Sequence, residues 1–94
     1  MVDVLAAAAL KTKLADLDGW SVAGDAITKM FEFADFDGAM KFVNQVAALA
    51  RQQNHHPDID IRYNQVALTL STHSAGGVTE QDLALAKLIE QAAP

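Results

Sequence analysis

The spacing of apolar residues along the chain predicts three helices. In residues 3–17 apolar residues recur at helical steps, at Leu5, Ala9, Leu10, Leu14 and Leu17. Residues 35–52 repeat that period at Phe36, Met40, Val43, Ala47 and Ala50. A third stripe contains Leu83, Ala86, Ile89 and Ala93. The expected N-caps are Asp3 for the first helix and Asp35 or Asp37 for the second, while "TEQD" at 79–82 resembles a capping box for the third.

Strict alternation of apolar and polar residues predicts strands between these helices. The segment "WSVAGDAITKMFEF" offers a short extended piece, a "GD" turn and a strand with Ile27, Phe31 and Phe33 on one face, interrupted by Lys29. Residues 59–63 and 66–70 alternate in the same way around "NQ", which is expected to form the turn of a β-hairpin that pairs Tyr63 near Val66.

The order of these elements is α-β-β-α-β-β-α, which predicts an α+β fold. A four-stranded antiparallel sheet is expected, with the helices packed on one face. The 94 residues contain no internal linker, so we expect residues 1–94 to form a single domain. A chain of this size is close to the limit at which partners supplement stability, which favours a homo-oligomer.

Composition and charge remove several functional classes. The net charge of -5 provides no uniform positive field, so no nucleic-acid partner is predicted. With no cysteine there is no disulfide, thiolate nucleophile or cysteine-based zinc site. The apolar run "VLAAAAL" is far shorter than the roughly 20 residues of a membrane span, so no membrane association is predicted. We expect a soluble, cytoplasmic protein.

All three histidines fall between residues 55 and 73. Pro57 disfavours helical geometry at His56, which places the histidine doublet on a loop. Because the hairpin doubles back, residues before Ile59 approach those after Leu70, and His55, His56 and His73 can converge. Imidazole has an unperturbed pKa of about 6.5, so such a cluster suits proton transfer near neutral pH.

Other interpretations of these residues compete with acid/base chemistry. Three imidazoles could hold zinc, but adjacent ligands are awkward and no familiar metal spacing accompanies them, so no metal site is predicted. A single loop histidine is more often just solvated. Asp82 is favoured as a helix cap, a role compatible with a second one in a site. Trp20 is more often a packing residue than a stacking platform, and Gly76 and Gly77 are expected to serve turn geometry.

The "HHPD" doublet, the hairpin ending in "STH", and "GGVTEQDLALA" together resemble the pterin-4a-carbinolamine dehydratase family. The likeness runs roughly from "GW" at 19 to "IEQ" at 91. Tyr63 lies seven positions after His56, His73 ten further on and Asp82 nine beyond that, which is the family's spacing. The resemblance implies an α+β domain that forms dimers, often paired into tetramers. It also implies removal of water from 4a-hydroxytetrahydropterin to give quinonoid dihydropterin without a metal or organic cofactor.

The resemblance also implies roles for individual residues. His55 and His73 correspond to an acid/base pair on opposite sides of the pterin ring, and His56 to a substrate-orienting residue that shares in proton transfer. The substrate slot would be lined by Pro57 and by the backbone around Thr72, His73 and Ser74. Asp82 would orient a histidine, and Trp20 would flank the pocket.

One position departs from the family pattern. Arg51 stands where members commonly carry an acidic residue, four places before His55. Directed into the site, its charge would disfavour a protonated imidazole, whereas directed to solvent it would complement the helix dipole. Two alternatives to the dehydratase therefore stay open: a non-enzymatic module for dimerisation or protein-partner binding, and a protein that binds a different pterin.

Overall fold

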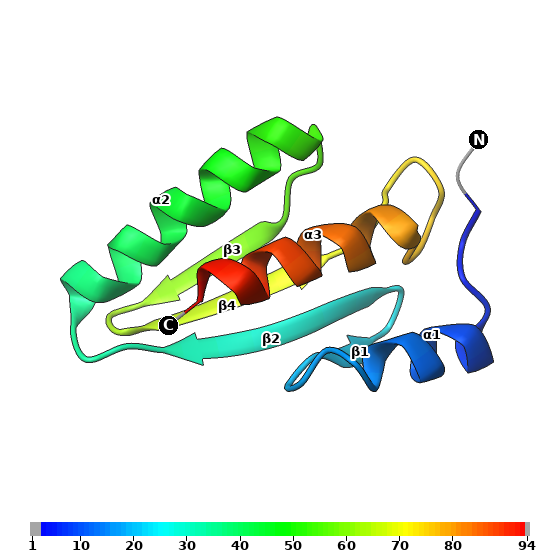
Figure 1. The fold of residues 1–94 in the computed structure, drawn as a ribbon, viewed down its shortest axis with the longest axis horizontal. Helices are drawn as coiled ribbons and strands as arrows, with labels where there is room; N and C mark the ends of the chain where they lie inside the picture. Colours follow the sequence, from blue (N-terminus) through cyan, green and yellow to red (C-terminus); the bar gives the residue numbers. More distant parts are fainter. Residues whose placement is uncertain (1–2, 94) are drawn as a thin grey trace.

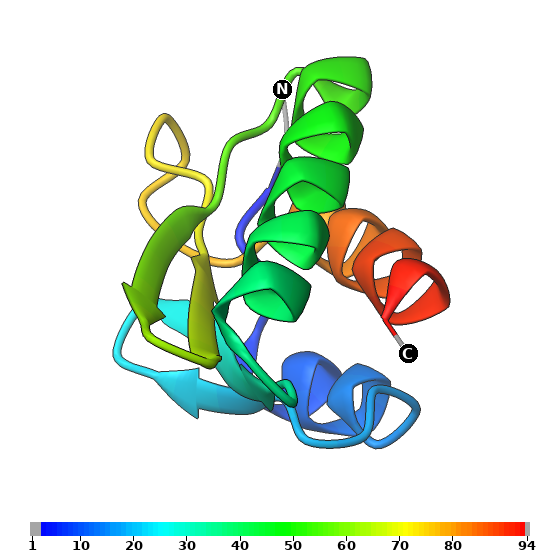
Figure 2. The same ribbon diagram turned by 90° about the vertical axis from the view of Figure 1, so that its left-hand side faces the viewer.

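One face of a twisted sheet carries the helical layer, with α2 and α3 side by side across it (Figures 1 and 2). The computed structural model describes residues 3–93. The elements are α1 (Ala7–Leu14), β1 (Ser21–Ala23), β2 (Ala26–Glu32), α2 (Phe36–Gln53), β3 (Asp58–Arg62), β4 (Gln65–Leu70) and α3 (Glu80–Ala92). This confirms the predicted order α-β-β-α-β-β-α. Within residues 3–93, no helix combines the length and apolar character needed to cross a bilayer.

The four strands form one antiparallel sheet in the order β1-β2-β4-β3. β2 and β4 occupy its centre, where Ile27 pairs with Leu70 and Phe31 with Val66. Side chains alternate between the two faces, and the face toward the helices carries the fully buried Ile27, Val66, Leu68 and Leu70. These residues form one core cluster with Leu83, Ala86 and Ile89 of α3, as the alternation and the last helical stripe predicted, and with Leu85, which lies outside that stripe.

Both long helices begin where their caps predict. The side chain of Asp35 accepts a 2.8 Å hydrogen bond from the amide of Gly38 at the start of α2. Thr79 and Asp82 form a reciprocal capping box at the start of α3. The two caps satisfy amides that have no partner inside the helix, which fixes the first turn of each helix.

The buried face of α2 is rotated about the helix axis from the predicted face, by about the width of one row of side chains. The buried residues are Ala39, Phe42, Val46 and Ala50, whereas Phe36 is 46% exposed. Phe42 decides the rotation of the helix, because its ring packs 4.8 Å from that of Phe31 and 5.0 Å from that of Phe33, measured between centroids. Of the predicted stripe only Ala50 is buried, and its other residues are left on a flank of the helix.

The first helix is shorter than predicted, and Asp3 does not cap it. α1 begins at Ala7, preceded by Ala6 in an extended conformation with no side-chain cap. The amide of Leu5 instead donates to the carbonyl of Val78 at 2.8 Å, which holds the preceding segment against the loop before α3. A Cβ at Gly77 would lie 2.9 Å from Val4, so the missing side chain permits this approach.

The turn of the β3–β4 hairpin lies one residue earlier than predicted. Arg62 pairs with Gln65, so the turn residues are Tyr63 and Asn64, and Tyr63 does not pair with Val66. Asn64 ties this turn to the end of β2, because its side-chain amide donates to the carbonyl of Phe33 and its own carbonyl accepts from the Phe33 amide, both at 2.8 Å. This contact between distant segments sets the register.

Candidate active site

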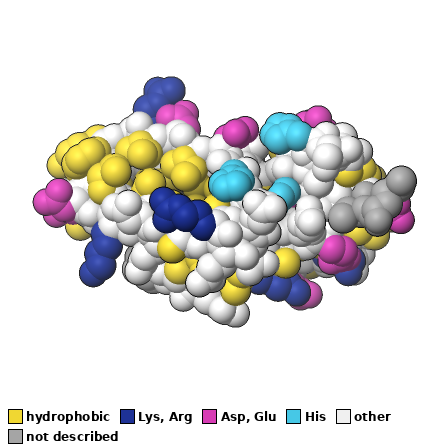
Figure 3. All heavy atoms as spheres, turned by 90° about the horizontal axis from the view of Figure 1, so that it is seen from above, with side chains coloured by type: hydrophobic (Ala, Val, Ile, Leu, Met, Phe, Trp, Pro, Cys, Tyr) yellow, Lys and Arg dark blue, Asp and Glu magenta, His cyan; other side chains and the backbone are white. Residues whose placement is uncertain are grey.

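The hairpin brings the three histidines to one pocket, as the sequence predicted. Asp58 pairs with Thr69, so the loop before β3 lies beside the loop after β4. The pocket has a volume of about 390 Å³, within the range of small-molecule sites. Its lining residues are all polar: Asn54, His55, His56, Ser71, Thr72, His73, Ser74 and Gln81. The imidazoles gather on one face of the molecule (Figure 3).

His55 differs from the other two histidines because a buried carboxylate holds it. Its Nε2 lies 2.5 Å from Oδ1 of Asp82. The side chain of His55 is 11% exposed and that of Asp82 is fully buried. His56 and His73 are exposed. A short contact between an imidazole and a buried carboxylate fixes the orientation of the ring relative to the pocket.

Asp82 is held by hydrogen bonds from three segments: the loop before β3 through His55, the loop after β4 through Thr72, and the cap of α3 through Thr79. Its Oδ2 accepts from the hydroxyl of Thr72, after β4, and from the amide of Thr79, at the cap of α3, both at 2.9 Å. The hydroxyls of Thr72 and Thr79 lie 2.7 Å apart. The helix N-terminus and the two donors stabilise a negative charge on Asp82. Asp82 therefore serves both as the cap and as the partner of His55.

These contacts determine where the hydrogens lie. A carboxylate only accepts, so Thr72 donates to Asp82, and Thr79 in turn donates to the oxygen of Thr72. For the same reason His55 carries a hydrogen on Nε2, which leaves Nδ1 as the ring nitrogen available to a ligand.

Thr72 lines the pocket, as the resemblance implied for the backbone around it, whereas Pro57 does not. The hydroxyl of Thr72 is buried and committed to Asp82 and Thr79, so its role in the structure is to position Asp82. Pro57 is half-buried and is not among the residues that line the pocket. Ser74 lines the pocket as expected.

Sequence reasoning missed four residues of this site: Asn54, Ser71, Gln81 and Thr79 in its contact with Thr72. Asn54 ends α2 in the left-handed conformation, with φ of 50°, a position that favours Gly or Asn after a helix. An Asn that follows a helical stripe could therefore have been found. Ser71 and Gln81 carry no comparable signal, because only the packing of α3 against the loop after β4 places them.

Trp20 does not flank the histidine pocket. It is 6% exposed and belongs to the core, and its indole Nε1 donates to Glu90 of α3 at 2.8 Å. Lys29 reaches the same carboxylate oxygen at 2.5 Å. The packing interpretation of Trp20 is thus correct, and the flanking role is wrong for this chain taken alone. Arg51 is exposed in the last turn of α2 and does not line the pocket.

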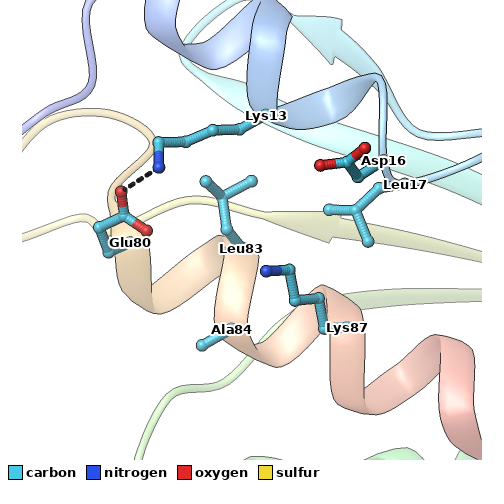
Figure 4. Close-up of a pocket in the computed structure, with 7 residues that line it drawn as sticks. All are labelled: Lys13, Asp16, Leu17, Glu80, Leu83, Ala84 and Lys87. Carbon is cyan, nitrogen blue, oxygen red and sulfur yellow. Dashed lines mark ion pairs between the residues drawn. The ribbon is translucent and has the colours of Figure 1, made fainter.

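A second pocket of about 240 Å³ lies between α1 and α3 (Figure 4). An exposed ion pair joins Lys13 to Glu80 at 3.1 Å, and Lys87 and Asp16 also line the pocket. Charges of both signs surround the apolar Leu17 and Leu83, and this pocket contains no histidine. Across residues 3–93, no group of three or more His, Asp or Glu side chains is placed to hold a metal ion.

The sheet covered on one face by helices, together with the carboxylate-held histidine in a polar pocket, defines a small α+β domain with a candidate acid/base site. The sequence profile described as "Pterin 4 alpha carbinolamine dehydratase" matches residues 3–92. A protein of Thermomicrobium roseum that is provisionally named a pterin-4-alpha-carbinolamine dehydratase is 49% identical over 86 residues, which are 92% of each chain. The chain belongs to the pterin-4-alpha-carbinolamine dehydratase family.

One solved structure agrees with this assignment, and a second shares the fold. The crystal structure of a transcriptional coactivator/pterin dehydratase from Brucella melitensis superposes with a TM-score of 0.93 at 40% identity, over 98% of this chain and 100% of the other. A pterin dehydratase-like protein identified as a RuBisCO assembly factor in the alpha-carboxysome shares the fold, with a TM-score of 0.65 at 24% identity, over 79% of this chain and 86% of the other.

Proposed function

We propose that this protein removes water from 4a-hydroxytetrahydropterin to give quinonoid dihydropterin. The observation that carries the proposal is the contact between His55 and the buried Asp82 on the wall of a pocket that His56 and His73 also line. Membership of the family supplies the substrate class.

The reaction needs one proton delivered and one removed. A general acid protonates the hydroxyl oxygen on C4a, the C4a–O bond breaks, and water leaves. The adjacent ring nitrogen loses its proton to a general base, and its electron pair forms the new C=N bond. The substrate loses only water, and the acid and base exchange protonation states, which solvent restores.

The two tasks fall to different histidines in this proposal. His55 is the base, because Asp82 keeps its Nδ1 free and stabilises the imidazolium that forms when Nδ1 takes a proton. His73 is the acid, because its exposure lets solvent reprotonate it after each turnover. His56 orients the substrate. Asp82 is a positioning residue that acts through His55.

The test is the rate at which enzymatically generated 4a-hydroxytetrahydropterin dehydrates, followed by ultraviolet absorbance with and without the protein. We expect a large acceleration that EDTA does not change. His55→Ala and His73→Ala should each lower turnover by at least about tenfold, because a positioned proton-transfer group contributes about 10²–10⁴-fold. Circular dichroism should show that both variants remain folded.

Arg51→Ala is the matched control, since Arg51 is close to His55 in the sequence but exposed and outside the pocket. Its rate should equal that of the wild type. A wild-type rate in both histidine variants would overturn the assignment of acid and base, and no acceleration by the wild-type protein would overturn the dehydratase proposal.

We also propose that the protein forms a homo-oligomer. A second candidate function, binding of a protein partner, is favoured by apolar side chains on the surface, such as Phe36 at 46% and Met30 at 60% exposure. The partner should then be retained by His55→Ala and His73→Ala. Loss of binding in these two folded variants would count against a partner site separate from the histidine pocket.

A further inference from the structure

The loop between β4 and α3 folds back on itself over residues 72–77 (Figure 1). An isolated antiparallel bridge joins Thr72 to Gly77, and the amide of Thr72 donates to the carbonyl of Gly77 at 2.9 Å. Residues 73–76 therefore form a closed turn, and two of them, His73 and Ser74, line the histidine pocket. The turn thus carries the acid of the proposed reaction.

The carbonyl of Thr72 is the centre of this turn. It accepts the amides of Ala75 and Gly76, both at 2.9 Å, and the amide of Gly77 at 3.4 Å. The amide of Gly76 also lies 3.1 Å from the carbonyl of His73. Because these bonds join only backbone groups, they form only when the backbone dihedral angles of the turn allow it. The same angles determine the direction in which the side chain of His73 leaves the chain.

Gly76 has the left-handed conformation that closes the turn. Its φ is +82°, a region that is unfavourable for a residue with a Cβ. Within residues 3–93, no atom lies within 4 Å of a Cβ built on Gly76. The backbone angle, and not a lack of space, therefore favours glycine here, which agrees with the turn geometry expected of this residue.

Thr72 also connects the turn to the other half of the site. Its hydroxyl donates to Oδ2 of Asp82, and Oδ1 of Asp82 holds His55. The backbone of Thr72 thus holds the turn of His73, while its side chain holds the partner of His55. Because both histidines are tied to this one buried residue, the position of one imidazole relative to the other depends on a closed turn.

We propose that Gly76 is a positioning residue for the dehydration, because its left-handed backbone keeps His73 where it protonates the hydroxyl that leaves C4a. The inference rests on the proposed function, in which His73 is the acid. A general acid acts only within hydrogen-bond reach of the leaving oxygen, and a displacement of about 1 Å can lower a rate by about 10²-fold. Gly76 is not among the residues that line the pocket, so it acts through the backbone of the turn.

The test is a graded series of variants, Gly76→Asn, Gly76→Ala and Gly76→Val, because these residues tolerate a positive φ progressively less well. Hydrogen exchange at the amides of Thr72 and Ala75 reports opening of the turn and should become faster in that order. The kcat for 4a-hydroxytetrahydropterin should fall in the same order, by about 10–10²-fold in Gly76→Val, with Gly76→Asn close to the wild type. KM should change much less, because most residues that line the pocket lie outside the turn.

Gly19→Ala is the matched control for Gly76→Ala. Gly19 has nearly the same φ, +86°, but does not line the histidine pocket. This variant should keep the wild-type kcat although it strains the backbone in the same way. If Gly76→Val does not fold by circular dichroism, Gly76→Ala gives the same comparison with a smaller fall in kcat.

Three results would overturn the positioning role. One is a wild-type kcat in the folded Gly76 variants in spite of faster exchange, and another is an equal fall in kcat in Gly19→Ala. The third is unchanged exchange at Thr72 and Ala75 across the series, which would show that Gly76 does not hold the turn closed. A wild-type protein without dehydratase activity would instead overturn the proposed function, and the positioning role with it, whatever the exchange rates show.

Discussion

Replacing Asp82 by asparagine should reverse the tautomer of His55 without changing the shape of the site. Oδ2 of Asp82 accepts from Thr72 and from the amide of Thr79. Both are donors, so the amide oxygen of asparagine must take this place. The NH₂ group then replaces Oδ1 and donates to Nε2 of His55. A neutral His55 is forced to carry its hydrogen on Nδ1, where the wild type has a free electron pair.

The size of the effect follows from these contacts. With Nδ1 blocked, the proposed base is lost, and kcat should fall by about 10²–10⁴-fold, the contribution of a positioned proton-transfer group. KM should change little, because Asp82 is buried and does not line the pocket. Charged hydrogen bonds are replaced by neutral ones at a buried helix N-terminus, so stability should fall by about 2 kcal/mol, and Tm by about 10 °C.

The tautomer can be measured directly by ¹⁵N chemical shifts of labelled histidine, since the chain has only three. Asp35→Asn is the matched control, because Asp35 caps α2 through one exposed bond to Gly38 and touches no histidine. Asparagine caps helices nearly as well as aspartate, so stability, spectrum and turnover should all stay as in the wild type. The reasoning is refuted if Asp82→Asn keeps its hydrogen on Nε2 of His55 and turns over at the wild-type rate.

Three further changes test the packing around the site, each by urea denaturation. Thr79→Val removes the hydroxyl that accepts from the amide of Gln81 and should lower the free energy of unfolding by about 1–2 kcal/mol, whereas Thr79→Ser should stay close to the wild type. Equal losses in the two variants would show that the hydroxyl does not stabilise the helix. Gly19→Ala should cost at least about 1–2 kcal/mol, because φ is +86° and the new Cβ would lie 2.8 Å from Lys29; unchanged stability would contradict this. Glu90→Ala leaves Trp20 and Lys29 without their shared acceptor and should lower the free energy of unfolding by about 1–3 kcal/mol, more than Glu90→Gln does. A larger loss in Glu90→Gln would contradict a stabilising role for these two contacts.

The order of elements and most of the sheet could be predicted from local patterns. Ile27 and Phe31 share a face because side chains alternate along any strand, whatever surrounds it. Asp35 and the Thr79–Asp82 box begin their helices because the free amides of a helix lie within three residues of the cap. The convergence of His55 and His56 with His73 follows from the hairpin, since antiparallel pairing brings its two outer ends together.

Contacts between distant segments decided the features that the sequence could not reveal. Several faces of α2 are apolar, and the rings of Phe31 and Phe33 determine that Phe42 turns inward and Phe36 outward. The hairpin turn shifts by one residue because Asn64 bonds to Phe33. Neither choice is encoded within a few residues of the chain.

The same distinction, between local patterns and contacts of distant segments, applies to the candidate active site. Local patterns predicted that the three histidines would meet at the outer ends of one hairpin and that Asp82 would cap a helix, because both depend on short-range spacing. The second role of the capping carboxylate, as the partner of His55, depends instead on the packing of α3 against the loop after β4, which buries Asp82 beside His55. A separate contact of α3, the hydrogen bond from Trp20 to Glu90, holds Trp20 in the core rather than beside the pocket. Burial and hydrogen bonding across distant segments depend on how complete elements pack, and the order of residues within one element does not contain that information.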